Sequence, residues 1–185
     1  MRKKMIIWTT TGILVILTCA AVWHYIYAWV PIKVLAPLFP TNESPWEHIK
    51  IVFFPAVIFY IFQYFYIGKN YRNYIFGHSL SLLIMPVVML SAFYGYKWIF
   101  GTNPSFIYNI FTTIICIAAG SFAAYKITLS EKNRENKAIG GILLALIIFS
   151  AEAVFTFIPP KLPLFYDTMN KTYGILEKYD TNHGN

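Results

Sequence analysis

Ionisable side chains inside apolar segments are the residues of this sequence that could carry chemistry. His24 and Glu152 each lie within a long apolar segment, and His48 belongs to a dense polar stretch at residues 42–50. A charged side chain that faces lipid is costly, so such residues usually face the interior of a helix bundle and often mark a functional site. Histidine and carboxylate groups can act as acid and base, or can ligate a metal ion.

These three side chains are expected to lie at a similar depth. At 1.5 Å per residue, His24 and Glu152 lie about 9 Å below the ends of their segments, and His48 lies about 6 Å beyond Ser44. We therefore expect His24, His48 and Glu152 to converge, with Glu152 as the hydrogen-bond partner of His24. If the protein binds a metal, these three are its expected ligands. The full candidate pocket consists of His24, Asn42, Glu43, Glu47, His48, Glu152 and Asp167.

Structural roles compete with the functional ones. Ser44 has the character of a helix N-cap, Pro45 suits the first helical position, and Glu47 stands at the capping-box position, so capping alone would account for Glu47. A lone buried histidine is usually hydrogen-bonded within the fold. A protonated Glu152 bonded to a neighbouring helix would equally account for a carboxyl group in an apolar segment.

The elements that must position these residues are five apolar segments, at residues 5–30, 49–67, 74–100, 105–128 and 138–158. Each approaches or exceeds the ~20 residues that cross a bilayer, and backbone groups in lipid must be satisfied within a helix. Only 12% of the residues are charged, whereas soluble domains carry about 25%. The sequence thus predicts an all-α integral membrane bundle of five transmembrane helices. It forms a single domain over residues 1–179, with an outer loop at 31–48, an extracytoplasmic tail at 159–179 and a disordered end at 180–185.

Lysine and arginine residues predict the orientation. With the N-terminus inside, the short outer loops contain only Lys33, Lys50 and Lys97, and the tail contains three further lysines. The positive-inside rule therefore favours an inner N-terminus and an outer C-terminus. The basic residues of the inner side are Arg2, Lys3, Lys4, Lys69, Arg72, Lys126, Lys132, Arg134 and Lys137.

Several classes of function are disfavoured. The net charge of +7 is spread in short clusters between apolar runs, and no nucleic-acid-binding motif accompanies it. Cys19 and Cys116 are isolated in separate apolar segments, so they predict neither a disulfide nor a zinc site. No motif assigns a cofactor or an oligomeric state, and the expected partners are the lipid bilayer and a small-molecule or lipid ligand.

Two motifs resemble those of a family of small bacterial membrane proteins known only as a domain of unknown function. One is Asn-Glu-Ser-x-Trp-Glu-His-x-Lys at residues 42–50, and the other is Pro-Pro-x-Leu-Pro-Leu-Phe-x-Asp at residues 159–167. In that family the Asp precedes Pro and a Thr-Gly turn, whereas Thr168 to Lys171 follow Asp167 here. The resemblance implies a multi-pass protein of the bacterial cytoplasmic (inner) membrane with a similar number of helices. It implies no activity.

Three functions remain open from the sequence. The first is a membrane protein with an outward-facing polar pocket that binds a solute, an ion or a lipid headgroup. The second is a membrane-embedded enzyme of the outer leaflet, with histidines and carboxylates as acid/base groups or metal ligands. The third is a structural or accessory subunit. The sequence has no nucleophile motif and no His-x-x-x-His pair to favour the enzyme, and no inverted repeat to favour a transporter.

Overall fold

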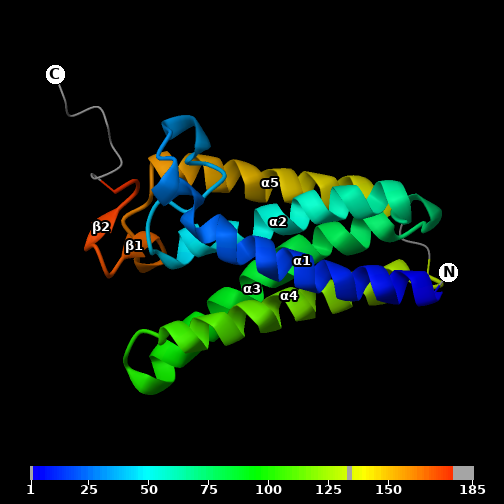
Figure 1. The fold of residues 1–185 in the computed structure, drawn as a ribbon, viewed down its shortest axis with the longest axis horizontal. Coiled ribbons are helices and arrows are strands. Elements are labelled where there is room, and N and C mark those ends of the chain that lie inside the picture. Colours follow the sequence, from blue (N-terminus) through cyan, green and yellow to red (C-terminus); the bar gives the residue numbers. More distant parts are fainter. Residues whose placement is uncertain (1, 133–134, 177–185) are drawn as a thin grey trace.

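Five long helices make up most of the computed structural model, which describes residues 2–132 and 135–176. Each of the five is long and apolar enough to cross a membrane. The chain is therefore a multi-pass membrane protein with an all-α fold, as the sequence predicted. Figure 1 shows the helices running side by side along the long axis of the molecule. They are α1 (Arg2–Trp29), α2 (Pro45–Tyr66), α3 (Tyr74–Phe100), α4 (Phe106–Thr128) and α5 (Ala138–Phe157).

We call the end of the bundle opposite the N-terminus the distal end. There α1 ends, α2 begins, and the segment after α5 folds back (Figure 1). This C-terminal segment contains a short 3-10 helix, η4 (Pro163–Phe165), and two short antiparallel strands, β1 (Tyr166–Asp167) and β2 (Thr172–Tyr173). Phe165 is buried against Trp46 at the start of α2. The segment after α5 is thus fastened to the helices by aromatic packing.

Helices α3 and α4 approach each other closely because small residues lie between them. A Cβ atom at Gly120 would lie only 2.5 Å from Cγ of Met85. Met85 and Ile117 belong to a buried core to which α1 and α2 contribute Ile16 and Phe53. In Figure 1 the distal ends of α3 and α4 diverge from the other three helices. A cleft lined by residues of α2, α3 and α4 opens at the distal end.

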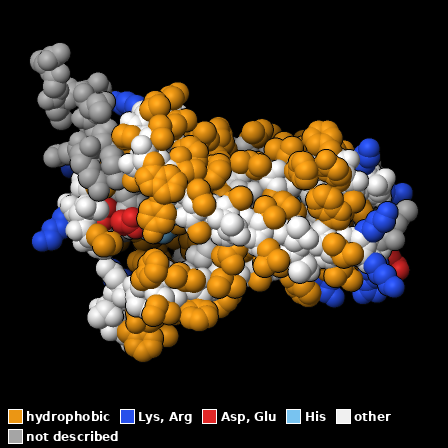
Figure 2. All heavy atoms as spheres, in the orientation of Figure 1, with side chains coloured by type: hydrophobic (Ala, Val, Ile, Leu, Met, Phe, Trp, Pro, Cys, Tyr) orange, Lys and Arg blue, Asp and Glu red, His pale blue; other side chains and the backbone are white. Residues whose placement is uncertain are grey.

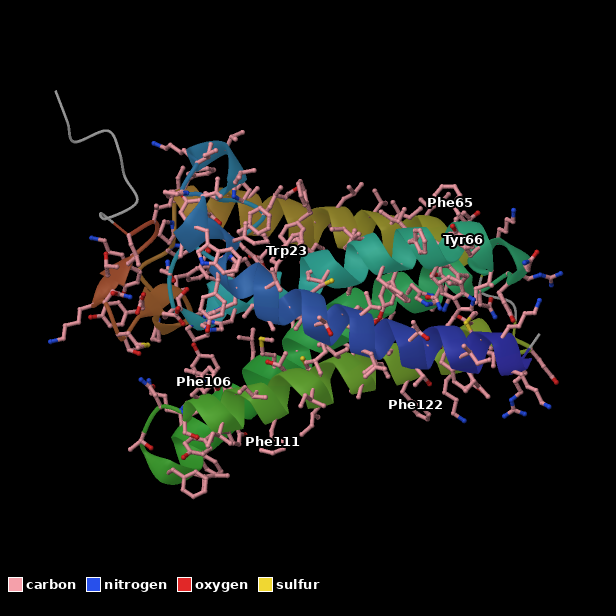
Figure 3. The ribbon with its side chains drawn as sticks, viewed as in Figure 1. Trp23, Phe65, Tyr66, Phe106, Phe111 and Phe122 are labelled. Carbon is pink, nitrogen blue, oxygen red and sulfur yellow. The ribbon has the colours of Figure 1, made fainter. Side chains whose placement is uncertain are left out.

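The surface around the middle of the bundle is apolar. Figure 2 shows hydrophobic side chains along the length of the helices and a group of basic side chains at the N-terminal end. Phe111 and Phe122 of α4 are 60% and 59% exposed, and Figure 3 shows them projecting away from the rest of the bundle. Because a surface with so many exposed apolar side chains is unfavourable in water, lipid is the solvent for this surface.

Helix α2 begins at Pro45, four residues before its apolar segment, because its N-terminus is capped as expected. The Oγ atom of Ser44 accepts a hydrogen bond of 3.3 Å from the backbone N–H of Glu47. The reciprocal half of the capping box is absent, since the Ser44 N–H donates to Oδ1 of Asn42 instead. The side chain of Glu47 is therefore available for another interaction.

Ser44→Ala is expected to lower the free energy of unfolding by about 1 kcal/mol, because one N–H at the start of α2 loses its acceptor. Unfolding of the purified protein in mixed micelles would measure this loss. Ser105→Ala is a matched variant, since the Oγ atom of Ser105 accepts a hydrogen bond from the backbone N–H of Tyr108 at the start of α4, where the bond is exposed. A loss at Ser44 of less than about 0.3 kcal/mol would mean that the cap is not needed there.

The orientation in the membrane remains a prediction. We expect reporter fusions in the loop between α4 and α5 to be cytoplasmic, and fusions at the C-terminus to be extracytoplasmic. Lys50, counted above with the outer loops, lies within α2 in the structure, so the outer loops are even poorer in basic residues than expected. A cytoplasmic C-terminus would contradict the positive-inside assignment. Arg134 and residues 180–185 of the predicted disordered end lie outside the described residues.

Candidate functional site

Three hydrogen bonds help to hold the loop between α1 and α2 over the distal end. Trp23 Nε1 donates to the carbonyl oxygen of Leu38, at 2.8 Å. Asn42 Nδ2 donates to the carbonyl oxygen of Gly174 in the C-terminal segment, at 2.7 Å. The backbone N–H of Glu43 donates to Oδ2 of Asp167, at 2.9 Å. These bonds anchor the loop up to Glu43, and α2 begins two residues later, so the side chain of Glu43 has a defined direction.

The carboxylate of Glu43 lies between two histidines. Its Oε1 is 3.5 Å from Nε2 of His24, and its Oε2 is 3.4 Å from Nε2 of His48. The two imidazole rings lie 5.4 Å apart, centroid to centroid. One ligand atom from each of the three side chains can be chosen so that all lie within 4.8 Å of one another. We call these residues, His24, Glu43 and His48, the distal triad.

A backbone carbonyl orients the imidazole of His48. Its Nδ1 lies 2.9 Å from the carbonyl oxygen of Ser44, which can only accept a hydrogen bond, so Nδ1 carries a proton. In the neutral ring, Nε2 then presents a lone pair to the Glu43 carboxylate, which is unfavourable unless a positive charge lies between them. A proton on Nε2 or a metal ion would supply that charge.

The spacing within the distal triad suits a metal better than a direct ion pair. Charge-assisted N–H···O bonds are usually about 2.7–2.9 Å long, shorter than the two contacts here. Two nitrogen or oxygen ligands at about 2.0–2.1 Å from a tetrahedral zinc ion would lie about 3.3–3.4 Å apart. The separations of 3.4 and 3.5 Å are close to that value, but each is measured to a different oxygen of Glu43. With one ligand atom from each residue the three atoms lie within 4.8 Å of one another, so the side chains would draw closer together around a single ion.

A cleft of about 160 Å³ opens beside the distal triad. Glu43 and His48 form part of its wall, and the distal ends of α3 and α4 form the opposite wall. Figure 2 shows a hollow at this end, with acidic side chains at its edge. The polar lining outside the triad consists of Tyr94, Lys97, Asn103, Asn109, Thr112, Thr113, Tyr166 and Thr168.

Glu47 does not belong to the distal triad but to a buried ion pair. Its Oε2 lies 2.7 Å from Nζ of Lys50, and neither side chain is more than 2% exposed. The other two protons of the ammonium group donate to the carbonyl oxygen of Ala36 and to the hydroxyl of Thr156. Glu47 also accepts from the N–H and the hydroxyl of Thr41. The pair therefore joins α2, the α1–α2 loop and α5.

Glu152 is fully buried beneath this pair. Its two carboxyl oxygens have no hydrogen-bond partner among the described residues. Lys50 and Glu47 are the charged groups that interact with it electrostatically. The carbonyl oxygen of Glu152 lies 2.7 Å from the hydroxyl of Thr156, which connects the two groups. Glu152 thus faces the protein interior rather than lipid, beside Lys50.

The seven candidate residues consequently fall into three groups. His24, Glu43 and His48 form the distal triad, in which Glu43 occupies the place that we expected for Glu152. Glu47 and Glu152 belong to the buried network around Lys50, so the expectation that Glu47 only caps a helix was wrong. Asn42 and Asp167 fasten the loop; Asp167 also accepts bonds from the N–H groups of Met169 and Asn170 and approaches Glu43 rather than His48.

Lys50 and Thr156 are the main residues that sequence reasoning missed. Lys50 was counted as a loop residue for the orientation, although it stands three positions after Glu47 and inside an apolar run. Side chains three positions apart share a helix face, so this spacing could have indicated an ion pair. Thr156 has no distinguishing signal, since a threonine in an apolar helix usually bonds its own backbone.

Comparison with known proteins gives a family but no activity. Residues 1–175 match a family described as "Family of unknown function (DUF6512)". Neither the curated proteins nor the solved structures include a significant match.

Proposed function

Since the chain belongs to a family of unknown function, we propose from the site itself that the protein binds a divalent transition-metal ion at the distal triad. The proposal places the protein in the bacterial cytoplasmic membrane, with the distal end facing outward. The resemblance described above and the distribution of basic residues support this location. The observation that carries the proposal is the position of Glu43 between the two Nε2 atoms, at 3.4 and 3.5 Å.

The donor atoms indicate the class of ion. Two imidazole nitrogens and one carboxylate oxygen suit zinc and its neighbours in the first transition row, whereas magnesium and calcium prefer oxygen ligands. The bond from His48 Nδ1 to the Ser44 carbonyl oxygen is the outer hydrogen bond that metal-binding histidines usually make. Because His48 is placed by the first turn of α2, this ligand is held by a helix rather than by a free loop.

Three protein ligands leave a fourth position for another molecule. In catalytic zinc sites that position is filled by water or substrate, and the ion acts as a Lewis acid. Here Glu43 and His48 both line the cleft, so the open position would face it. Binding of a solute in an outward-facing cleft is the function we favour. A metal-dependent enzyme of the outer leaflet is the second candidate, and the same open position supports it.

A zinc titration of the purified full-length protein tests the proposal. We expect one zinc ion to bind per chain, reversibly on addition of a chelator and without competition from a large excess of magnesium. The double variant His24→Ala/His48→Ala should lose this binding while its helix content is retained. Absence of saturable binding, or equal binding by the double variant, would overturn the proposal.

A further inference from the structure

The cleft beside the distal triad contains a cationic side chain in addition to the proposed metal ion. Lys97, in the last turn of α3, lines the wall opposite Glu43 and His48. Its ammonium group makes no ion pair or hydrogen bond with the residues that the structure describes. Among the residues that the structure describes, Glu43 is the one acidic residue of the cleft lining, and a bound metal would neutralise its charge. With the metal in place, the cleft therefore has a net positive charge.

Neutral hydrogen-bonding groups also line the cleft. Asn109, Thr112 and Thr113 of α4 line the cleft, and Asn103 Nδ2 donates to the hydroxyl of Thr168 across it, at 3.0 Å. Amide and hydroxyl donors of this kind, combined with a lysine and a metal ion, suit a group with several anionic oxygens. A phosphate group can bridge a metal and a lysine while it accepts further bonds, so its chemistry fits this lining.

The size and position of the cleft point to a lipid as the source of the phosphate. Pockets for whole drug-sized ligands are usually about 300–1,000 Å³, so a cleft of about 160 Å³ suits a headgroup but not a larger molecule. Met89, Leu90 and Phe93 add an apolar part to the lining. Next to the cleft, Trp98 in the last turn of α3 is 87% exposed and Phe106 at the start of α4 is 71% exposed, as expected for residues at a membrane interface.

We propose that the metal-loaded cleft binds the phosphate group of an anionic lipid, with the acyl chains remaining in the bilayer. The inference rests on the proposed metal site. The phosphate oxygens would occupy the open position of the ion and contact the ammonium group of Lys97. The same phosphate chemistry is available from free phosphate in solution, and the experiment has to distinguish the two sources.

The test uses the full-length protein in nanodiscs of phosphatidylcholine, with and without zinc, and a fluorescent phosphatidic acid as the probe. We expect the zinc-loaded protein to bind the probe in competition with unlabelled phosphatidic acid. Lys97→Gln should weaken this binding at least tenfold without weakening zinc binding, because it removes a positive charge from the cleft, while Lys33→Gln, at an exposed lysine of the α1–α2 loop, should have no effect on either. Inorganic phosphate should not displace the probe at concentrations similar to that of the lipid.

Each contrary result has a separate meaning. If the protein binds zinc but not the probe, or if Lys97→Gln binds the probe normally, the lipid inference is overturned and the metal site stands. If inorganic phosphate displaces the probe as readily as the lipid does, a lipid is not the preferred ligand and the inference fails in that part. If zinc does not bind, the proposed function fails, and zinc-independent binding of the probe would overturn the role given to the metal here.

Discussion

Replacing Lys50 by methionine is expected to lower the free energy of unfolding by about 3–5 kcal/mol. Methionine has a similar length, so it fills the space of the lysine stem but removes the ammonium group. Glu47 would then remain fully buried without its cation, and Thr156 and the Ala36 carbonyl oxygen would lose their donor. Equilibrium unfolding in mixed micelles, followed by circular dichroism, measures the effect.

Two further variants separate this explanation from a general effect of mutation. Lys33→Met, at an exposed lysine of the α1–α2 loop, should change the free energy of unfolding by less than about 0.5 kcal/mol. The double variant Glu47→Leu/Lys50→Met removes both charges and should recover much of the loss, because replacing a buried pair by apolar residues is often neutral. A loss below about 1 kcal/mol for Lys50→Met would contradict the burial of a charged pair.

Replacing Glu43 by glutamine is expected to weaken zinc binding more than about 100-fold, the upper end of the effects seen for outer hydrogen-bond partners of metal ligands. Glutamine keeps the shape of the side chain but loses the negative charge that both histidines face. The backbone N–H of Glu43, which donates to Asp167, is unchanged by the substitution, so the loop should keep its position. Competition titration against a chelator of known affinity measures the change.

The matched control is Glu131→Gln, at an exposed glutamate near the opposite end of the bundle. It changes the net charge by the same amount and should leave zinc affinity within about twofold, since surface charges at that distance are screened by salt. If Glu43→Gln and Glu131→Gln weaken zinc binding equally, the affinity for zinc would depend on the overall charge of the protein rather than on the distal triad.

The helical framework could be predicted because it follows from local properties of the sequence. The third segment, at residues 74–100, agrees with α3 in the structure, since its apolar run has clear boundaries. The start of α2 was predictable from Ser44 and Pro45 even though the apolar run begins later. Backbone N–H and C=O groups in lipid must be hydrogen-bonded within their own segment, so an apolar segment of this length has little alternative to a helix.

The composition of the site was only partly predictable. Depth along a helix axis placed His24, His48 and Glu152 in one layer, but depth does not fix rotation about the axis. Glu152 instead lies beneath Lys50, while Glu43 reaches the histidines from a loop. The direction of a loop side chain depends on distant contacts, here the bond to Asp167 more than a hundred residues later. No local pattern in the sequence encodes such a contact.

X-ray absorption spectroscopy of the zinc-loaded full-length protein tests the metal site most directly, because it reports the atoms bound to the ion. We expect two imidazole ligands at about 2.0–2.1 Å and the remaining ligands to be oxygen. His48→Ala should reduce the imidazole contribution to one ligand, and the exposed-site variant Glu131→Gln should leave the spectrum unchanged. A spectrum without imidazole ligands, or one that His48→Ala does not alter, would contradict a metal site formed by His24, Glu43 and His48.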